Sequence, residues 1–178
     1  MLRPDDDEQL LENVMSKLGS TDEPPKRLNP ERKTKPWCLP GFSGNARVTT
    51  SFGDLPIEAL RLRDPVKTRS GRFLKVQWID KVQLDEQFLS LHPEANPILI
   101  PDSSLGSMTP CNDVLVSPGQ VLRMPRQTSD MKAMPAQSLV WRRNVERKPQ
   151  RGFTYYLFHC GEPASISVEG LWFEVVPG

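Results

Sequence analysis

Six residues of this chain have side chains suited to covalent or acid–base chemistry. They are Cys38, Cys111, Cys160, His92, His159 and Ser117. A cysteine acts as a nucleophile through its thiolate, which at neutral pH needs a neighbouring base or cation to form. Cys38 follows a proline-rich stretch and has no histidine near it in the sequence, so the residues alone favour an unreactive thiol. We expect Cys111 and Cys160 to be packing residues.

The other chemical groups also have ordinary structural interpretations. Ser117 lacks the G-x-S-x-G pattern of a hydrolase nucleophile, so its hydroxyl is expected to support a turn before Pro118. His159 lies in a strand-like run, which favours a structural histidine. The three cysteines are far apart and form no C-x-x-C pair, so the sequence predicts neither a zinc site nor a disulfide framework. We therefore expect no metal and no cofactor, and a reducing compartment.

The charge of the chain is nearly balanced. Lysine and arginine number 23 against 22 aspartate and glutamate residues, a formal net charge of +1. No general field attracts nucleic acid or an anionic membrane. A local basic run, Arg142, Arg143, Arg147, Lys148 and Arg151 beside Trp141, can contact phosphates or an acidic protein, although a solvated loop is the default interpretation.

The first 37 residues differ in composition from the remainder. Residues 5–18 place apolar side chains on one helical face: Leu10, Leu11, Val14, Met15 and Leu18. An isolated helix of this length is marginal in water, so we expect it to be ordered only against another surface. Residues 20–37 are rich in proline and charge, which predicts an extended linker. Neither a signal peptide nor a membrane span is predicted.

Short β-rich runs separated by Gly, Pro, Asp and Ser follow, which predict an all-β fold. We expect strands at residues 47–50, 65–68, 73–79, 97–100, 113–116, 121–123, 154–159, 165–168 and 171–176. Residues 84–91 and 137–142 can each form one or two helical turns. We expect the four tryptophans to pack in the core or at its edge, and Trp37 can also anchor the linker.

Several of these segments occur in the order typical of one family. Residues 50–60 (TSFGDLPIEAL), with Asp64, Val66, Thr68 and Gly71, resemble the opening of bacterial Hedgehog/intein (Hint)-like domains. Residues 113–118 (DVLVSP) and 169–174 (EGLWFE) continue the resemblance, which covers about three quarters of the chain. It implies a compact Hint-like β domain over residues 38–178, after a helical arm at 1–19 and a linker at 20–37.

The resemblance also implies a chemistry, self-cleavage of the chain, for which residues are missing. In such domains a Cys or Ser at the first position attacks the preceding carbonyl, and a histidine in a [ST]-x-x-H segment assists. An ungapped alignment places Gly41 at the first position, whereas an insertion of three residues places Cys38 there. The [ST]-x-x-H segment reads Ser117-Pro118-Gly119-Gln120, and Pro163 aligns with a second usual histidine. A glutamine amide cannot take up a proton at neutral pH.

These patterns predict a non-enzymatic structural or protein-binding module built on a degenerate Hint fold, with no catalytic residues. Its arm, through the Leu10 to Leu18 stripe, would dock on a protein partner, a second copy or a larger assembly such as a phage-like particle, in the cytoplasm or within that assembly. We expect no small-molecule substrate, nucleic acid or membrane as a partner. The alternative is self-cleavage before Cys38 through a thioester, with Ser117 and Gln120 as polarising groups. A third possibility is polyanion binding by the basic run.

Overall fold

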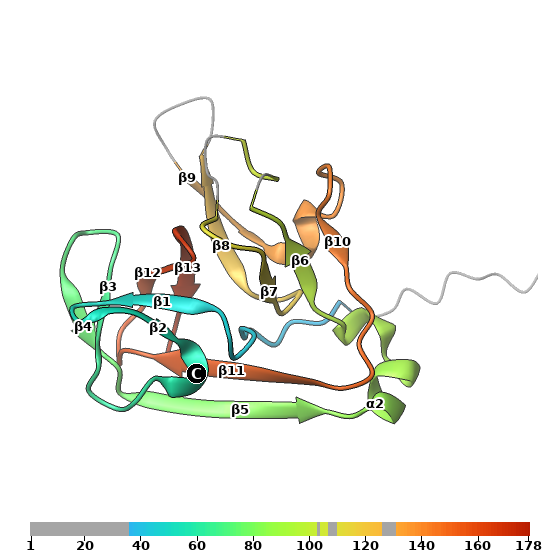
Figure 1. The fold of residues 1–178 in the computed structure, drawn as a ribbon, viewed down its shortest axis with the longest axis horizontal. Coiled ribbons are helices and arrows are strands. Elements are labelled where there is room, and N and C mark those ends of the chain that lie inside the picture. Colours follow the sequence, from blue (N-terminus) through green and yellow to red (C-terminus); the bar gives the residue numbers. More distant parts are fainter. Residues whose placement is uncertain (1–35, 103, 107–109, 126–130) are drawn as a thin grey trace, which may run out of the picture. The chain divides into compact units, whose positions relative to one another are not determined.

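A computed structural model describes residues 36–102, 104–106, 110–125 and 131–178, and the described part is built almost wholly of β-strands (Figure 1). The strands are β1 (Arg47–Thr50), β2 (Gly53–Pro56), β3 (Pro65–Lys67), β4 (Phe73–Lys75), β5 (Trp78–Leu84), β6 (Ile98–Ile100), β7 (Val114–Val116), β8 (Val121–Pro125), β9 (Met131–Pro135), β10 (Glu146–Arg147), β11 (Phe153–His159), β12 (Ala164–Val168) and β13 (Leu171–Val175). The helices are α2 (Glu86–Leu91) and the 3₁₀ turns η1 (Ile57–Ala59), η2 (Pro93–Ala95) and η3 (Ala136–Leu139).

The strands form three sheets with antiparallel pairing throughout. The largest has the order β4-β3-β1-β12-β13-β8-β9, and β2 also pairs with β1. A second sheet has the order β10-β6-β7, and β5 pairs with β11 in a separate ribbon. β5 and β11 run side by side over seven residue pairs, from Trp78 opposite His159 to Leu84 opposite Phe153 (Figure 1). Strands distant in sequence therefore meet, as in a fold that curls on itself.

One apolar core lies between these sheets. Its fully buried side chains come from alternate positions of the strands, which is the period expected when one face of a strand is covered. The largest of them include Phe42, Phe173, Ile98, Ile100, Leu122 and Ile166. The Phe42 ring meets Phe173 edge-on, with centroids 5.2 Å apart. A smaller cluster around Tyr155, Leu84 and Leu89 has Trp37 packed against it.

A buried carboxylate ties the start of the domain to its last hairpin. Glu169 accepts hydrogen bonds from the Arg47 backbone N–H at 2.8 Å and from the Asn112 side-chain amide at 2.9 Å. It stands in the turn between β12 and β13 with a positive φ of 49°. Because a buried carboxylate needs donors to remain stable, this pairing gives Glu169 a structural role.

The all-β prediction is confirmed, and most predicted strands are present within a residue or two of their observed bounds. The run at 73–79 is in fact two strands, because it breaks at Val76 and Gln77. Three strands were missed, namely β2, β9 and β10. Gly53 and Gly71 have the positive φ values expected of turn glycines, at 111° and 84°.

Some of the packing predictions were wrong. Cys111 is exposed, whereas Cys160 is buried as expected. Trp141 is 75% exposed and so packs neither in the core nor at its edge, whereas Trp78, 41% exposed, stacks on His159. The helical turn expected within residues 84–91 is present as α2, with Leu89 buried and Leu91 exposed. The helical arm at 1–19 and all but two residues of the linker at 20–37 lie outside the described residues.

Candidate functional site

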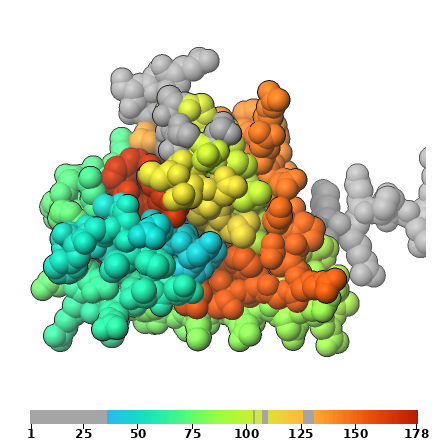
Figure 2. All heavy atoms as spheres, in the orientation of Figure 1, coloured from blue at the N-terminus to red at the C-terminus, as the bar shows by residue number. Residues whose placement is uncertain are grey.

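The segment that leads into the domain, residues 36–41, passes beside the loop that follows β7. Immediately after it, Phe42 forms isolated bridges with Val116 on one side and Tyr156 on the other. Its backbone exchanges hydrogen bonds with Tyr156 at 3.0 and 2.9 Å. In Figure 2 this part of the chain, in blue, lies beside the yellow residues near 116 and the orange residues of β11. The leading segment is thus fixed against two strands far from it in sequence.

Ser117 holds the leading segment through its hydroxyl. The Oγ atom donates to the backbone oxygen of Leu39 at 2.5 Å and accepts from the indole Nε1–H of Trp37 at 3.0 Å. The Ser117 backbone N–H also donates to the oxygen of Gly41 at 2.8 Å. With 0% of its surface exposed, Ser117 uses its polar groups for positioning. The prediction that the hydroxyl would serve only the turn before Pro118 was therefore incomplete.

Gln120 contacts the leading segment three residues further along. Its side-chain oxygen accepts from the Gly41 N–H at 3.0 Å, and its side-chain nitrogen donates to the backbone oxygens of Glu174 at 2.8 Å and Val121 at 3.2 Å. Only 1% of the residue is exposed. Each polar atom of this buried amide has a partner, which is what stable burial of an amide requires.

Two glycines leave room for this arrangement. A Cβ atom on Gly119 would lie 2.5 Å from both the carbonyl carbon and the oxygen of Cys38, closer than real Cβ contacts come. A Cβ atom on Gly41, where φ is +147°, would lie 2.8 Å from Cβ of Tyr155. Position 41 therefore accepts no side chain unless Tyr155 moves, and no cysteine or serine fits there as the structure stands. We call Ser117, Gly119 and Gln120 the clamp.

Tyr155 closes the buried side of the clamp. Its hydroxyl donates to the Ala95 oxygen at 2.7 Å. Burial raises the pKa of the Tyr155 phenol well above its usual value, while the Arg147 charge lowers it to a smaller extent. A phenol with such a pKa stays protonated at neutral pH and cannot act as a base.

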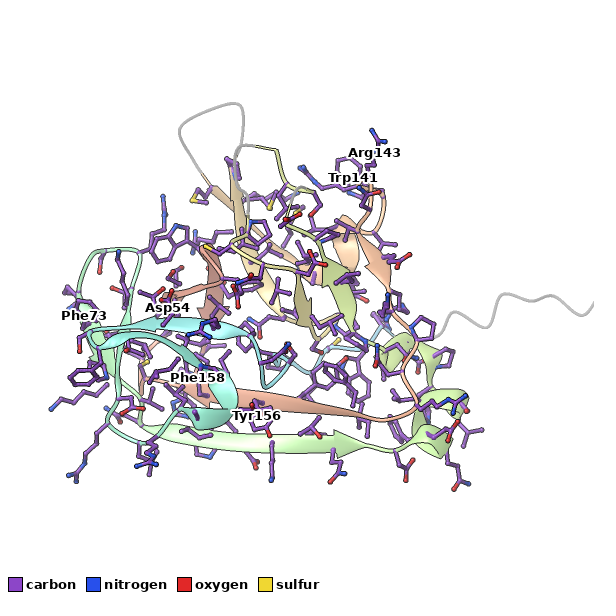
Figure 3. All side chains as sticks on the ribbon, in the orientation of Figure 1. Asp54, Phe73, Trp141, Arg143, Tyr156 and Phe158 are labelled. Atoms are coloured by element: carbon purple, nitrogen blue, oxygen red, sulfur yellow. The ribbon has the colours of Figure 1, made fainter. Side chains whose placement is uncertain are left out.

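A mostly apolar cavity of about 480 Å³ opens next to the clamp. Its lining includes Gly41, Gln120, His159, Glu174 and Gly178. The His159 ring stacks on Trp78 at 5.3 Å, and its Nδ1 accepts from the Gly161 N–H at 3.1 Å. This agrees with the structural role predicted for His159, although its place beside Gln120 was not foreseen. Figure 3 labels Tyr156 and Phe158 on β11, the strand that carries His159 into this region.

The structure brings Ser117 and Gln120 to the same segment as Cys38, but it does not join Cys38 to them. The Cys38 thiol is exposed and donates to the backbone oxygen of Pro36 at 3.2 Å. Within the described residues, no carboxylate or imidazole forms a hydrogen bond with the side chains of Cys38, Ser117 or Gln120. Gln120 binds the N–H of Gly41 and Gly119 lies against the backbone of Cys38, so both alternative first positions lie beside the clamp.

The basic run does not form one surface. Arg147 points inward and donates to the backbone oxygens of Glu94 and Asn96, and burial lowers the pKa of its guanidinium. Arg142 lies over the Trp141 ring at 4.9 Å. Trp141 and Arg143 stand together at the end of the loop after η3 (Figure 3). This division of the run gives no support to polyanion binding by all five residues.

The described ranges hold neither a metal-binding cluster nor a membrane-spanning helix. No group of three or more His, Cys, Asp or Glu side chains in them is placed to hold a metal ion. None of their helices is long and apolar enough to cross a membrane. Residues 1–35, with the stripe from Leu10 to Leu18, lie outside these ranges, so the structure does not test that prediction.

Comparison with known proteins gives a family and several solved structures. A family model described as the Hint domain matches residues 40–177. The gp41-1 intein is 10% identical, with a TM-score of 0.47, covering 76% of this chain and 98% of that chain. The Ssp DnaB mini-intein variant M86 is 7% identical, with a TM-score of 0.49, covering 78% and 96%. The AceL NrdHF class 3 split intein, in a splice-inactive variant, is 13% identical, with a TM-score of 0.48, covering 78% and 99%. No curated protein sequence matches the chain.

Proposed function

Since the chain belongs to the Hint domain family, we propose that it uses this fold as a non-enzymatic assembly or protein-binding module. The observation that carries the proposal is the contact between Gln120 and Gly41. The residue that should bear a nucleophile has no side chain and no room for one, and the residue that should be histidine is an amide. The two partners are nevertheless held together at 3.0 Å.

Amide cleavage needs a nucleophile, a proton carrier and a polarised peptide bond acting together. The clamp offers hydrogen bonds to the Leu39 oxygen and the Gly41 N–H, but among the described side chains that bind the leading segment none takes up a proton at neutral pH. The polar atoms of the clamp hold the leading segment in position. This supports a domain that fixes the chain preceding it and does not cleave it.

In the proposed function, the helical arm of residues 1–19 docks on a partner protein or a second copy within a larger assembly. The support for this part is the apolar stripe in the sequence, and the clamp provides a rigid origin for the arm. Trp37 contributes to that origin, because its ring meets Phe88 edge-on at 6.0 Å while its N–H binds Ser117.

Substitutions on the stripe test the docking arm in the full-length chain. We expect Leu11→Asp with Met15→Asp to release a tagged chain from its native complexes, measured by size-exclusion chromatography of cell extracts. Glu12→Gln, on another face of the predicted helix, should leave the elution unchanged. Removal of residues 1–34, which keeps Trp37, should release the chain from its complexes in the same way and leave the β-sheet circular dichroism spectrum unchanged. Unchanged elution of the double variant would refute docking through the arm.

Self-cleavage before Cys38 remains the second candidate, because this thiol is exposed and adjoins the clamp. In this mechanism the thiol would attack the carbonyl of Trp37, with Ser117 and Gln120 as polarising groups. It predicts that purified protein shortens with time and that Cys38→Ala abolishes the shortening.

A further inference from the structure

A second pocket lies on the large sheet, lined by residues from three separate segments. The turn between β3 and β4 contributes Thr68, Arg69, Ser70 and Arg72, β8 contributes Arg123, and the start of β12 with its preceding loop contributes Glu162 and Ser165. The cavity volume is about 450 Å³, within the range of small-ligand sites. The turn is fixed to β12 by a hydrogen bond from the Arg69 N–H to the Ser165 oxygen at 2.9 Å. We call this the arginine pocket.

The charges of the arginine pocket do not cancel. Three guanidinium groups line it against the single carboxylate of Glu162, an excess of two positive charges among the lining residues. Glu174, just outside, pairs with Arg123 and reduces the local excess to one. Arg69 forms no ion pair with any described residue. The lining therefore keeps a local positive charge, in a chain whose positive and negative residues are otherwise nearly balanced.

The Arg123 side chain is fixed by two contacts within the chain and keeps one unpaired donor group. Its Nε–H donates to Ser165 Oγ at 3.1 Å, and Nη2 binds Glu174, while Nη1 has no partner among the described residues. The Ser165 hydroxyl accepts this bond and keeps its own proton to donate. Fixed donors of this kind bind a ligand without a further loss of side-chain entropy.

The ion pair between Arg72 and Glu162 is weak, and a competing anion can replace Glu162 in it. The two side chains are 3.6 Å apart and are 70% and 54% exposed. Exposed pairs of this kind contribute little, so an anion of higher charge can displace Glu162. The planar guanidinium fork matches the oxygens of a phosphate group, and charge-assisted bonds of this type are stronger than neutral ones.

We propose that the arginine pocket is a binding site for a phosphate-type oxyanion, carried by a small molecule or by a phosphorylated side chain. Arg69 and Arg72 approach the anion from the β3–β4 turn, and Arg123 and Ser165 supply donors from the sheet. The pocket shares no lining residue with the clamp, although Glu174 contacts both, and its proposal does not rest on the assembly function.

Isothermal titration calorimetry of the full chain at low, constant ionic strength tests this site. The probes are inorganic phosphate and O-phosphoserine, each titrated against a chloride background. We expect saturable binding with one site per chain, and Arg69→Gln should weaken it about tenfold through loss of charge-assisted bonds. Arg143→Gln, the same change of charge on the exposed loop after η3, should leave the affinity unchanged. Tighter binding of phosphoserine identifies a phosphorylated side chain as the source, and tighter binding of inorganic phosphate identifies a free anion.

The absence of saturable binding of both probes would overturn the proposal. Equal weakening by Arg69→Gln and Arg143→Gln would overturn it as well, because binding would then follow overall charge and not the pocket. Arg69 is exposed, so its substitution should not unfold the protein, and an unchanged thermal midpoint is the check.

Discussion

The clamp and the arginine pocket are both polar, but they differ in how completely their groups are paired. In the clamp, Ser117 and Gln120 are buried and every polar atom of the Gln120 amide has a partner within the chain. In the arginine pocket, the exposed Arg69 side chain forms no ion pair with a described residue, and Nη1 of Arg123 has no described partner. Saturated buried groups hold structure, whereas unsaturated exposed groups remain free to bind something else.

The largest expected effect is the loss of the Gln120 amide. Gln120→Ala leaves the Gly41 N–H and the Glu174 oxygen buried without their partner, at about 1–3 kcal/mol for each. We expect the free energy of unfolding to fall by about 2–6 kcal/mol in urea denaturation. Gln83→Ala, on the exposed side of β5, serves as the matched control and should change it by less than about 0.5 kcal/mol. Equal effects of the two substitutions would contradict the buried role of Gln120.

Substitution of Gly41 tests whether position 41 can carry a nucleophile. Gly41→Ala and Gly41→Cys both bring a Cβ atom against Tyr155 at a positive φ, so we expect each to cost about 2–4 kcal/mol of unfolding free energy. Gly152→Ala is the control, since its added Cβ would meet the nearest atom at an ordinary 3.5 Å. Wild-type stability of Gly41→Cys would show that the site accepts a nucleophile after all.

The Ser117 hydroxyl is expected to contribute less than Gln120. Ser117→Ala removes the partner of the Trp37 indole and of the Leu39 oxygen, at a cost of about 1–2 kcal/mol. We also expect the Trp37 fluorescence to shift to longer wavelength as the leading segment loosens, with Trp78, Trp141 and Trp172 replaced by phenylalanine to isolate the signal. An unchanged emission maximum would mean that Trp37 is held by Phe88 packing alone.

The smallest expected effect appears at alkaline pH. Burial raises the pKa of the Cys160 thiol to about 11 and that of the Tyr155 phenol further still. Both groups hold their protons more tightly in the folded than in the unfolded state, so the unfolding free energy is unaffected below the ordinary pKa values and falls as pH rises from about 9 towards 11. Tyr155→Phe should make this decline shallower in thermal melts between pH 8 and 11. Identical slopes for the variant and the wild type would contradict the assignment.

Much of the fold could be predicted because the strands carry local signals. β1, β6, β7 and β13 alternate or are continuously apolar, and turn glycines separate them. β2, β9 and β10 were missed because they are short or contain proline and charge, so that pairing with a neighbour, not propensity, makes them strands. The exposure of Trp141 likewise depends on a loop that leaves the core, which composition does not reveal.

The sites were only partly predictable, since each joins distant segments. Ser117 and Gln120 were found through the family resemblance, but their contacts with Leu39 and Gly41 span about 80 residues of sequence. The arginine pocket could not be predicted from the sequence, because Arg69, Arg123 and Ser165 meet only through strand pairing across the large sheet. The glutamine at the position of the expected histidine indicated a non-catalytic site, but the sequence did not reveal that Gln120 is buried and holds Gly41.

The central claim, that this Hint domain does not cut its own chain, is tested most directly by the intact mass of the purified full-length protein. The protein is incubated for days at neutral pH with and without dithiothreitol, beside Cys38→Ala. The account predicts a single species of 20.2 kDa under every condition. A thiol-dependent split into residues 1–37 and 38–178, absent from Cys38→Ala, would contradict it and make Cys38 a working nucleophile.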